Sequence, residues 1–175
     1  IFFFIFLIII SLYRSPYIFF EGRFLYGDAF FFANALNNTW EYTLFLIHKE
    51  AGYINLFSNL SSLINAKLIN LYYAPLFNTY FCFLSILLLF YILIFANSDY
   101  FKSNFERYIV SLVILISPPF IFEIWLNNLN NQIYLAIITF FVLFLRHKKI
   151  DLFFYIPLLL LSGLSGIYSC LITPL

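Results

Sequence analysis

The sequence predicts an all-α, polytopic membrane protein, and composition is the first reason. Of its 175 residues, 64% are hydrophobic and only 10% are charged, whereas soluble domains average about 25% charged residues. A soluble chain with so little charge could not cover its surface with polar groups. The second reason is the alternation of long apolar runs with short polar breaks. Together these features make the lipid bilayer the first expected partner.

The apolar runs predict about five transmembrane helices, because one span needs about 20 apolar residues. The run 1–13 fits the end of a first span, with a signal-peptide core as the alternative. A full-length span is expected over 74–97, where Pro75 occupies a favourable first-turn position. The remaining spans are expected over 108–122, 132–145 and 152–172.

Three further features limit the class of protein: the two chain ends, the net charge and the cysteines. The chain contains no methionine and stops at Leu175, directly after an apolar run. We therefore expect residues 1–175 to be one membrane domain from the N-terminal part of a longer protein. The net charge of +1 and the lack of a basic patch exclude a nucleic-acid partner. Cys82 and Cys170 lie in apolar runs and are expected to pack as small side chains.

The segment 14–73 is the one long stretch that does not fit a membrane span, and it contains many of the ionisable side chains. Two helical patterns, over 28–40 and 53–68, have an apolar face and a polar face. Such amphipathic helices fit the membrane interface, with the apolar side toward the lipid. Packing against the spans is the alternative.

Positive charges predict the orientation in the plasma membrane. The short breaks 97–107 and 146–151 are rich in basic residues, namely Lys102, Arg107, Arg146, Lys148 and Lys149. Short basic loops lie on the cytoplasmic side of a membrane. The long segment 14–73 and the amide-rich turn 127–132 are then expected to share the non-cytoplasmic face.

Polar segments that meet on one face predict a site for a sugar phosphate. Asp28 and Glu21 are the candidate catalytic residues, because a carboxylate can take a proton from a hydroxyl or hold a divalent metal ion. Arginine matches phosphate oxygens, and amides offer donors and acceptors to sugar hydroxyls. The candidate substrate-binding residues are Arg14, Arg23, Lys67, Glu123, Asn127, Asn128 and Asn131.

These candidates also have structural interpretations. Asp28 precedes a helical pattern and fits a helix N-cap as well as a catalytic acid. Glu21 fits a surface pair with Arg23 or Arg14. His48 has no metal-ligand pattern around it. Other residues fit an aromatic belt at the membrane interface, namely Tyr13, Tyr17, Trp40, Tyr72, Tyr73 and Trp125.

The layout resembles the type C integral-membrane glycosyltransferases and a set of uncharacterised bacterial multi-pass proteins. The resemblance is carried by Glu21–Asp28, Phe32–Ala35, Ala51–Leu56, Tyr73–Pro75 and Asn127–Gln132. It implies a polyprenyl-phosphate-linked sugar donor and a catalytic acid in the first outer loop, at Asp28. The proteins that this layout resembles carry two adjacent acids where this sequence has Gly27-Asp28. This chain therefore lacks the pair of acids that could bind a metal ion.

Two other functional classes are compatible with the sequence. A non-catalytic membrane scaffold needs only packing and interface anchoring, which every feature above can provide. A transporter would place ionisable groups or helix breaks in the middle of the membrane. Here the charges avoid the apolar runs, which makes transport the less favoured class.

Overall fold

The computed structural model describes residues 1–48, 52–96, 100–117, 125–143 and 149–172, and its regular structure is almost entirely helical. The exception within these residues is an antiparallel pair of two-residue strands, β1 (Ile47–His48) and β2 (Tyr53–Ile54). The predicted all-α class is therefore confirmed.

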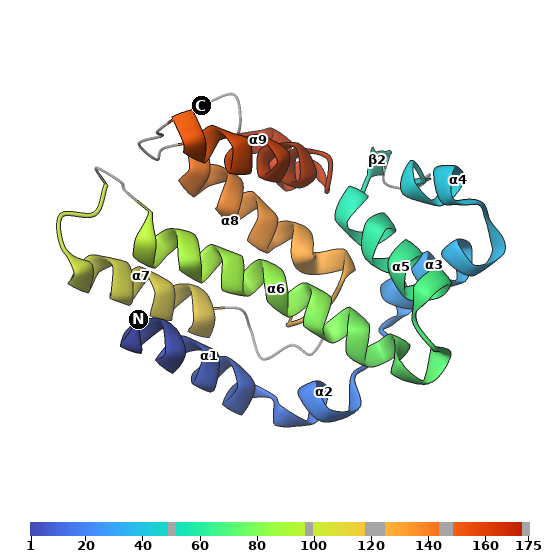
Figure 1. The fold of residues 1–175 in the computed structure, drawn as a ribbon, viewed down its shortest axis with the longest axis horizontal. Helices are drawn as coiled ribbons and strands as arrows, with labels where there is room; N and C mark the ends of the chain where they lie inside the picture. Colours follow the sequence, from blue (N-terminus) through green and yellow to red (C-terminus); the bar gives the residue numbers. More distant parts are fainter. Residues whose placement is uncertain (49–51, 97–99, 118–124, 144–148, 173–175) are drawn as a thin grey trace.

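Helix α6 (Ala74–Phe95) forms the axis of the molecule. With the preceding turn η1 (Leu71–Tyr73), it is the one helix in the described ranges that is long and apolar enough to cross a membrane. This length and composition support association with a membrane. The helices α1 (Phe2–Arg14), α7 (Asn104–Ile116) and α8 (Gln132–Leu143) pack against α6, as Figure 1 shows.

The hydrophobic core lies mainly along α6 and α8. Ile86, Leu89 and Phe90 of α6 are buried, and so are Leu135 and Ile138 of α8. Large apolar side chains remain exposed on the peripheral helices, because the described chain has too few polar residues to cover them. Extended apolar surface of this kind fits contact with lipid.

The chain bends after α1 and enters the short helix α2 (Pro16–Glu21). Pro16 suits this start, because its missing N–H belongs to a position that has no partner within a helix. The helix ends at Gly22, whose φ of 67° favours glycine. A Cβ at Gly22 would lie 2.4 Å from backbone atoms of Pro75 and Leu76, so the missing side chain lets α2 approach the start of α6.

After α2, the polar segment 14–73 forms three further α-helices at one end of α6 (Figure 1). They are α3 (Tyr26–Asn37), α4 (Trp40–Leu44) and α5 (Leu56–Leu68). The sequence pattern predicts helices over 28–40 and 53–68, so it locates α3 and α5. It misses the turn before α4, where the Thr39 hydroxyl accepts the Tyr42 N–H and begins a new helix.

Helix α5 packs through both of its faces. Asn59, Ser62 and Asn65 on the polar face are buried. Phe57 and Leu63 on the apolar face are buried as well, whereas Leu68 at the end of the helix is exposed. The polar groups find partners inside the protein; Asn65 Nδ2, for example, donates to the Ala74 carbonyl at 2.9 Å. The expected arrangement, with the polar face toward water, is therefore wrong for α5. The alternative of packing against the rest of the chain describes it.

The later apolar runs also differ from their predicted bounds. Helices α7 and α8 overlap the runs 108–122 and 132–145, although 118–124 and 144–148 lie outside the described residues. The run 152–172 is not one continuous helix. The structure divides it into α9 (Lys149–Gly163) and α10 (Ile167–Ile172). The division coincides with a contact to α5, because Ser165 Oγ accepts the Phe57 N–H at 2.8 Å, and with a φ of 126° at Gly166.

Candidate functional site

Asp28 lies at the centre of the most developed polar network in the described structure. Its side chain is 1% exposed, although it belongs to the polar segment predicted to face water. The carboxylate lies between α3, the start of α6 and the segment 125–131, which precedes α8. Asp28 therefore joins the two polar regions that the sequence predicts to converge.

Both carboxylate oxygens of Asp28 accept hydrogen bonds from N–H groups. Oδ1 accepts the backbone N–H groups of Asn128 and Leu129, at 3.0 and 3.3 Å. Oδ2 accepts from the Leu25 backbone at 3.3 Å and from the side-chain amides of Asn78 and Asn127 at 3.2 and 3.5 Å. Five donors leave little capacity on this carboxylate for a substrate hydroxyl. The Asp28 carboxylate therefore acts as a structural hydrogen-bond acceptor for these N–H groups.

The N-cap interpretation of Asp28 is close to the observed geometry but wrong by three residues. Leu25 occupies the N-cap of α3, and Asp28 is the third residue of the helix. From there its side chain reaches back to the Leu25 N–H, which is the second half of a capping box. Leucine cannot cap with its own side chain, so Asp28 supplies the capping interaction at this end.

The segment 125–131 consists of a turn followed by the short 3-10 helix η2 (Leu129–Asn131), and side chains from other elements hold it in place. Leu126 has a φ of 54°, which is uncommon for a residue with a side chain. Ser58 Oγ donates to the Asn128 carbonyl at 2.9 Å, and Asn55 Nδ2 donates to the Leu129 carbonyl at 3.3 Å. Irregular backbone at such depth needs polar partners of this kind, because water is excluded.

The two predicted phosphate-binding arginines contact this segment from another side. Arg23 donates through Nη2 to the carbonyl of Trp125. The guanidinium carbon of Arg14 lies 4.3 Å from the centre of the Trp125 ring, a cation–π arrangement, and Arg14 also donates to the Leu115 carbonyl. Trp125 is 3% exposed, so its predicted place in an interfacial aromatic belt is wrong.

The remaining predicted site residues are distributed differently. Asn131 is buried and accepts the Ser85 hydroxyl at 2.7 Å, beside the network. Lys67 is at the last turn of α5 and donates to the Leu36 carbonyl, where it closes the end of α3. Glu123 lies outside the described residues.

Several network residues are absent from the sequence prediction. Asn78 and Ser85 are polar residues within the apolar run of α6, seven positions apart and therefore on one helix face. Buried polar residues in an apolar helix need partners, so this spacing was the available signal. Ser58 and Asn55 had a weaker signal, because they belong to the face of α5 that was expected to meet water.

The environment of Asp28 predicts how stability depends on pH. Burial raises the pKa of the Asp28 carboxyl above its ordinary value, and the hydrogen bonds from Leu25, Leu129 and Asn128 offset part of this effect. The folded pKa is thus above the unfolded pKa of about 3.9. Asp28 then contributes most to stability below the unfolded pKa, and this contribution decreases as the pH rises through the folded pKa.

The difference in unfolding midpoint between the wild type and Asp28→Ala is accordingly expected to be larger at pH 4 than at pH 7. Thermal unfolding of both proteins in detergent over this range measures it, since alanine has no titrating group. A difference that grows toward pH 7 would contradict the stated direction of the pKa shift.

The carboxylate of Asp28 is not available as a ligand for a metal ion. A metal needs unoccupied oxygen lone pairs, and the two oxygens of Asp28 already accept five N–H groups. Among the described residues, no three His, Cys, Asp or Glu side chains lie together as ligands. His48 instead packs beside the rings of Phe30, Phe31 and Tyr53.

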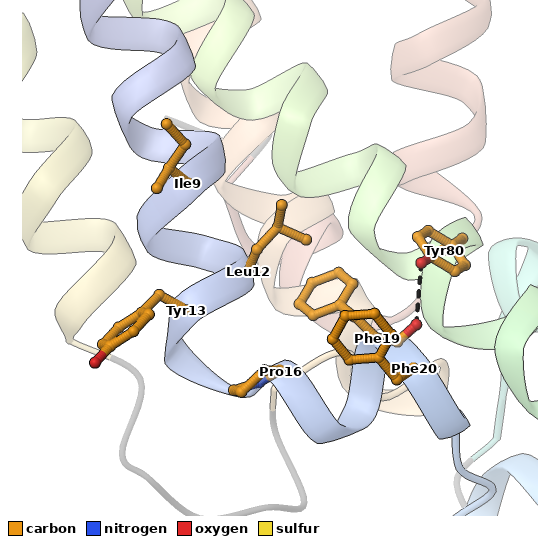
Figure 2. A pocket seen from close by; sticks show the side chains of 7 residues that line it. All are labelled: Ile9, Leu12, Tyr13, Pro16, Phe19, Phe20 and Tyr80. Carbon is orange, nitrogen blue, oxygen red and sulfur yellow. Dashed lines mark hydrogen bonds between the residues drawn. The ribbon is translucent and has the colours of Figure 1, made fainter.

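An apolar groove of about 450 Å³ opens at the junction of α1, α2 and α6. Figure 2 shows its lining residues: Ile9, Leu12, Tyr13, Pro16, Phe19, Phe20 and Tyr80. One wall is fixed by the Tyr80 hydroxyl, which donates to the Phe19 carbonyl at 3.0 Å. The groove is almost entirely hydrocarbon and aromatic, so it suits an apolar chain.

Glu21 follows the groove residue Phe20 and is exposed at the end of α2. A hydrogen bond to Glu21 raises the pKa of the Tyr17 hydroxyl, which lies one helical turn earlier. An exposed carboxyl paired with a phenol can exchange protons with a bound molecule. Of the two candidate catalytic acids, Glu21 is the accessible one.

No family model matches the chain, and no curated protein or solved structure is detectably similar to it.

Proposed function

We propose that this chain is the N-terminal membrane part of a multi-pass glycosyltransferase-like protein that uses a polyprenyl-phosphate-linked sugar on the non-cytoplasmic face. The observation that carries the proposal is an apolar groove whose lining residue Phe20 is followed in the sequence by an exposed acid. The groove lined by Phe19, Phe20 and Tyr80 suits an isoprenoid chain, and Glu21 is the residue after Phe20. A lipid-linked donor has the same order of parts, an apolar chain followed by a polar head group.

In this proposal Glu21 is the general base and Asp28 is a structural residue. The Glu21 carboxylate takes the proton of the acceptor hydroxyl, and the hydroxyl oxygen bonds to the anomeric carbon of the donor sugar. The bond between that carbon and the phosphate oxygen breaks, and its electron pair leaves on the polyprenyl phosphate. The saturated hydrogen bonding of Asp28 supports this division of roles.

Replacing Glu21 with glutamine is expected to lower the transfer rate about a hundredfold or more, the usual range for loss of a general base. Release of polyprenyl phosphate from a labelled donor, with full-length protein in membranes, measures the rate. Glu41→Gln is the matched control, because Glu41 is an exposed acid on α4, away from the groove. Full activity of the Glu21 variant would overturn the assignment, and no turnover by the wild type would overturn the transferase proposal.

The multi-pass arrangement is tested by accessibility from the two sides of the membrane. We expect a cysteine at Asn37, an exposed residue at the end of α3, to react with an impermeant thiol reagent added outside cells. A cysteine at Lys102, which is also exposed, should react only after the membrane is opened. The background carries Cys82→Ala and Cys170→Ala. Equal labelling of both positions in intact cells would contradict the proposed topology.

A non-catalytic scaffold is the second candidate, and one observation favours it. The carboxylate at the centre of the polar network is buried and saturated, because Asp28 is 1% exposed and already accepts five N–H groups. Such a network stabilises a fold without chemistry. If donor turnover is absent in the full-length protein, while the Asp28 network is needed for stability, the scaffold function is favoured.

A further inference from the structure

The turn between α5 and α6 presents large apolar side chains on the surface of the described chain. Leu68, Leu71, Tyr72 and Tyr73 are between 55% and 79% exposed, and we call them the turn cluster. They follow one another closely in sequence, and Figure 1 shows their turn at the start of α6. Grouped apolar side chains on a surface mark a contact with a membrane or with a partner.

The backbone of this turn is held by hydrogen bonds within the protein. Asn70 accepts the Tyr72 N–H through Oδ1 at 3.0 Å and the Tyr73 N–H through its carbonyl at 2.9 Å. The Ala74 carbonyl accepts the Asn65 side-chain amide at 2.9 Å, which ties the turn to α5. A backbone whose polar groups have such partners can meet an apolar phase, where unpaired N–H and C=O groups are costly.

The place of the turn cluster along α6 points to the kind of partner. The helical stretch Leu71–Phe95 has 25 residues and is long and apolar enough to cross a membrane. At about 1.5 Å per residue this stretch is about 37 Å long, whereas the hydrocarbon core of a bilayer is about 30 Å thick. Its first turn then lies at the head groups. Exposed tyrosines suit this layer, because the ring is apolar and the hydroxyl can bond to water or to a head group.

We propose that the turn cluster anchors the start of α6 in the head-group region of a phospholipid bilayer. The two leucines enter the acyl boundary, and the two tyrosines lie between the acyl chains and the water. Lys67 directly precedes the cluster, and its Nζ donates to the Leu36 carbonyl at 3.2 Å, at the end of α3. A positive charge at this place suits the phosphates of lipid head groups.

The anchor sets the depth of Glu21 in the membrane. Its neighbour Gly22 packs on the first turn of α6, where a Cβ would lie 2.4 Å from backbone atoms of Pro75 and Leu76. Glu21 is therefore held close to the level of the turn cluster, which is the level of a lipid's phosphate. The inference rests on the proposed function for the membrane location alone, and the depth is measured without any transfer reaction.

Spin labels on single cysteines measure the depth of the turn cluster. The labelled variants are Tyr72→Cys in the cluster, Leu84→Cys at an exposed position in the middle of α6, and Lys102→Cys at an exposed position in the polar break after α6. The background carries Cys82→Ala and Cys170→Ala. Full-length protein is placed in phosphatidylcholine vesicles, and each label is exposed to oxygen, which concentrates in lipid, and to a nickel chelate, which stays in water.

We expect the ratio of oxygen access to chelate access at position 72 to lie between the high ratio at 84 and the low ratio at 102. This places the label within about 5–10 Å of the boundary between head groups and acyl chains, as for other interfacial segments. Adding Leu68→Ser and Leu71→Ser should shift the ratio at 72 toward the value in water, because the apolar groups of the anchor are removed. An unchanged ratio in that variant would show that the leucines do not anchor the turn.

Three results would overturn the inference. A ratio at 72 equal to that at 102 places the turn in water, and a ratio equal to that at 84 places it in the hydrocarbon. Low access of both agents to 72 shows that protein covers the cluster, either a second copy or another part of the chain.

If the cysteine background does not fold, Tyr72→Trp in the natural sequence gives the same comparison. The emission that it adds to the wild type should be quenched more by phospholipids brominated near the head group than by phospholipids brominated at the chain end. Quenching by neither lipid contradicts the anchor. A cluster at head-group depth in a protein that transfers no sugar keeps the anchor and removes the proposed transferase function. Sugar transfer with position 72 in water does the reverse.

Discussion

Replacement of Asp28 by alanine is expected to lower the free energy of unfolding by about 3 kcal/mol or more, because each buried donor left without an acceptor costs about 1–3 kcal/mol. The backbone N–H groups of Asn128, Leu129 and Leu25 all lose their acceptor in this variant, as do the amides of Asn78 and Asn127. Denaturant or thermal unfolding of full-length protein in detergent measures the loss.

Two controls separate this effect from a general loss of charge. Asp28→Asn should cost less than alanine, because its remaining carbonyl oxygen can accept from Asn128 and the Asn78 amide can rotate to accept from the new NH₂ group. Glu41→Ala removes an exposed acid and should change stability by less than about 0.5 kcal/mol. If alanine at position 28 costs no more than alanine at position 41, the network is not stabilising.

Gly22→Ala is expected to be the most damaging change of a single methyl group in the described chain. The new Cβ would lie 2.4 Å from Leu76 N and from the Pro75 carbonyl carbon, and these backbone atoms cannot move aside as a flexible side chain can. The φ of 67° adds a left-handed strain of about 1–2 kcal/mol. We expect a total loss of about 3 kcal/mol or more, since overpacking adds about 1–3 kcal/mol.

Gly52→Ala is the matched control for the backbone strain alone. Gly52 has a φ of 71°, but a Cβ there would meet no atom within 4 Å. Its alanine variant should therefore lose about 1–2 kcal/mol. Equal unfolding midpoints for the two variants would show that α2 does not pack against the start of α6 as described. A larger loss at Gly22 measures the contribution of that close approach.

The sequence predicts the helical class and the main helix because both depend on long, uniform signals. The apolar run that begins at Ala74 has a proline in its first turn and no charge inside, and it forms α6. Asp28 contacts Asn127 and Asn128 of the other polar segment, while the shared membrane face that the alternation of segments predicts stays a prediction. Signals of this kind extend over many residues and tolerate local errors.

The role of Asp28 could not be predicted, because it depends on partners distant in sequence. Its hydrogen-bond donors include Asn78, Asn127 and Asn128, 50 to 100 positions away. The burial of the polar face of α5 could not be predicted for the same reason. An amphipathic pattern does not say which face of a helix packs against the protein. Trp125 at a polar break is typical of an interfacial residue, and its burial and its contact with Arg14, 111 positions earlier, show otherwise.

The break between α9 and α10 was a missed local signal. Gly163, Ser165 and Gly166 follow one another closely in the apolar run. Small residues in an apolar run also allow close packing of helices. In the structure Gly166 has a φ of 126°, and its missing side chain makes room for the Gln132 amide. Paired glycines near the end of an apolar run predict a turn as readily as a packing face.

One buried carboxylate, that of Asp28, holds the segment 125–131 against α3 and α6. Hydrogen–deuterium exchange tests it most directly, because Asn128 and Leu129 donate their backbone N–H groups to Asp28. In full-length Asp28→Ala, the peptide covering 125–131 should exchange much faster than in the wild type. A core peptide of α6 around Ile86 and Leu89 should keep its protection, which shows that the variant remains folded. Unchanged protection of 125–131 in the alanine variant would contradict the claim.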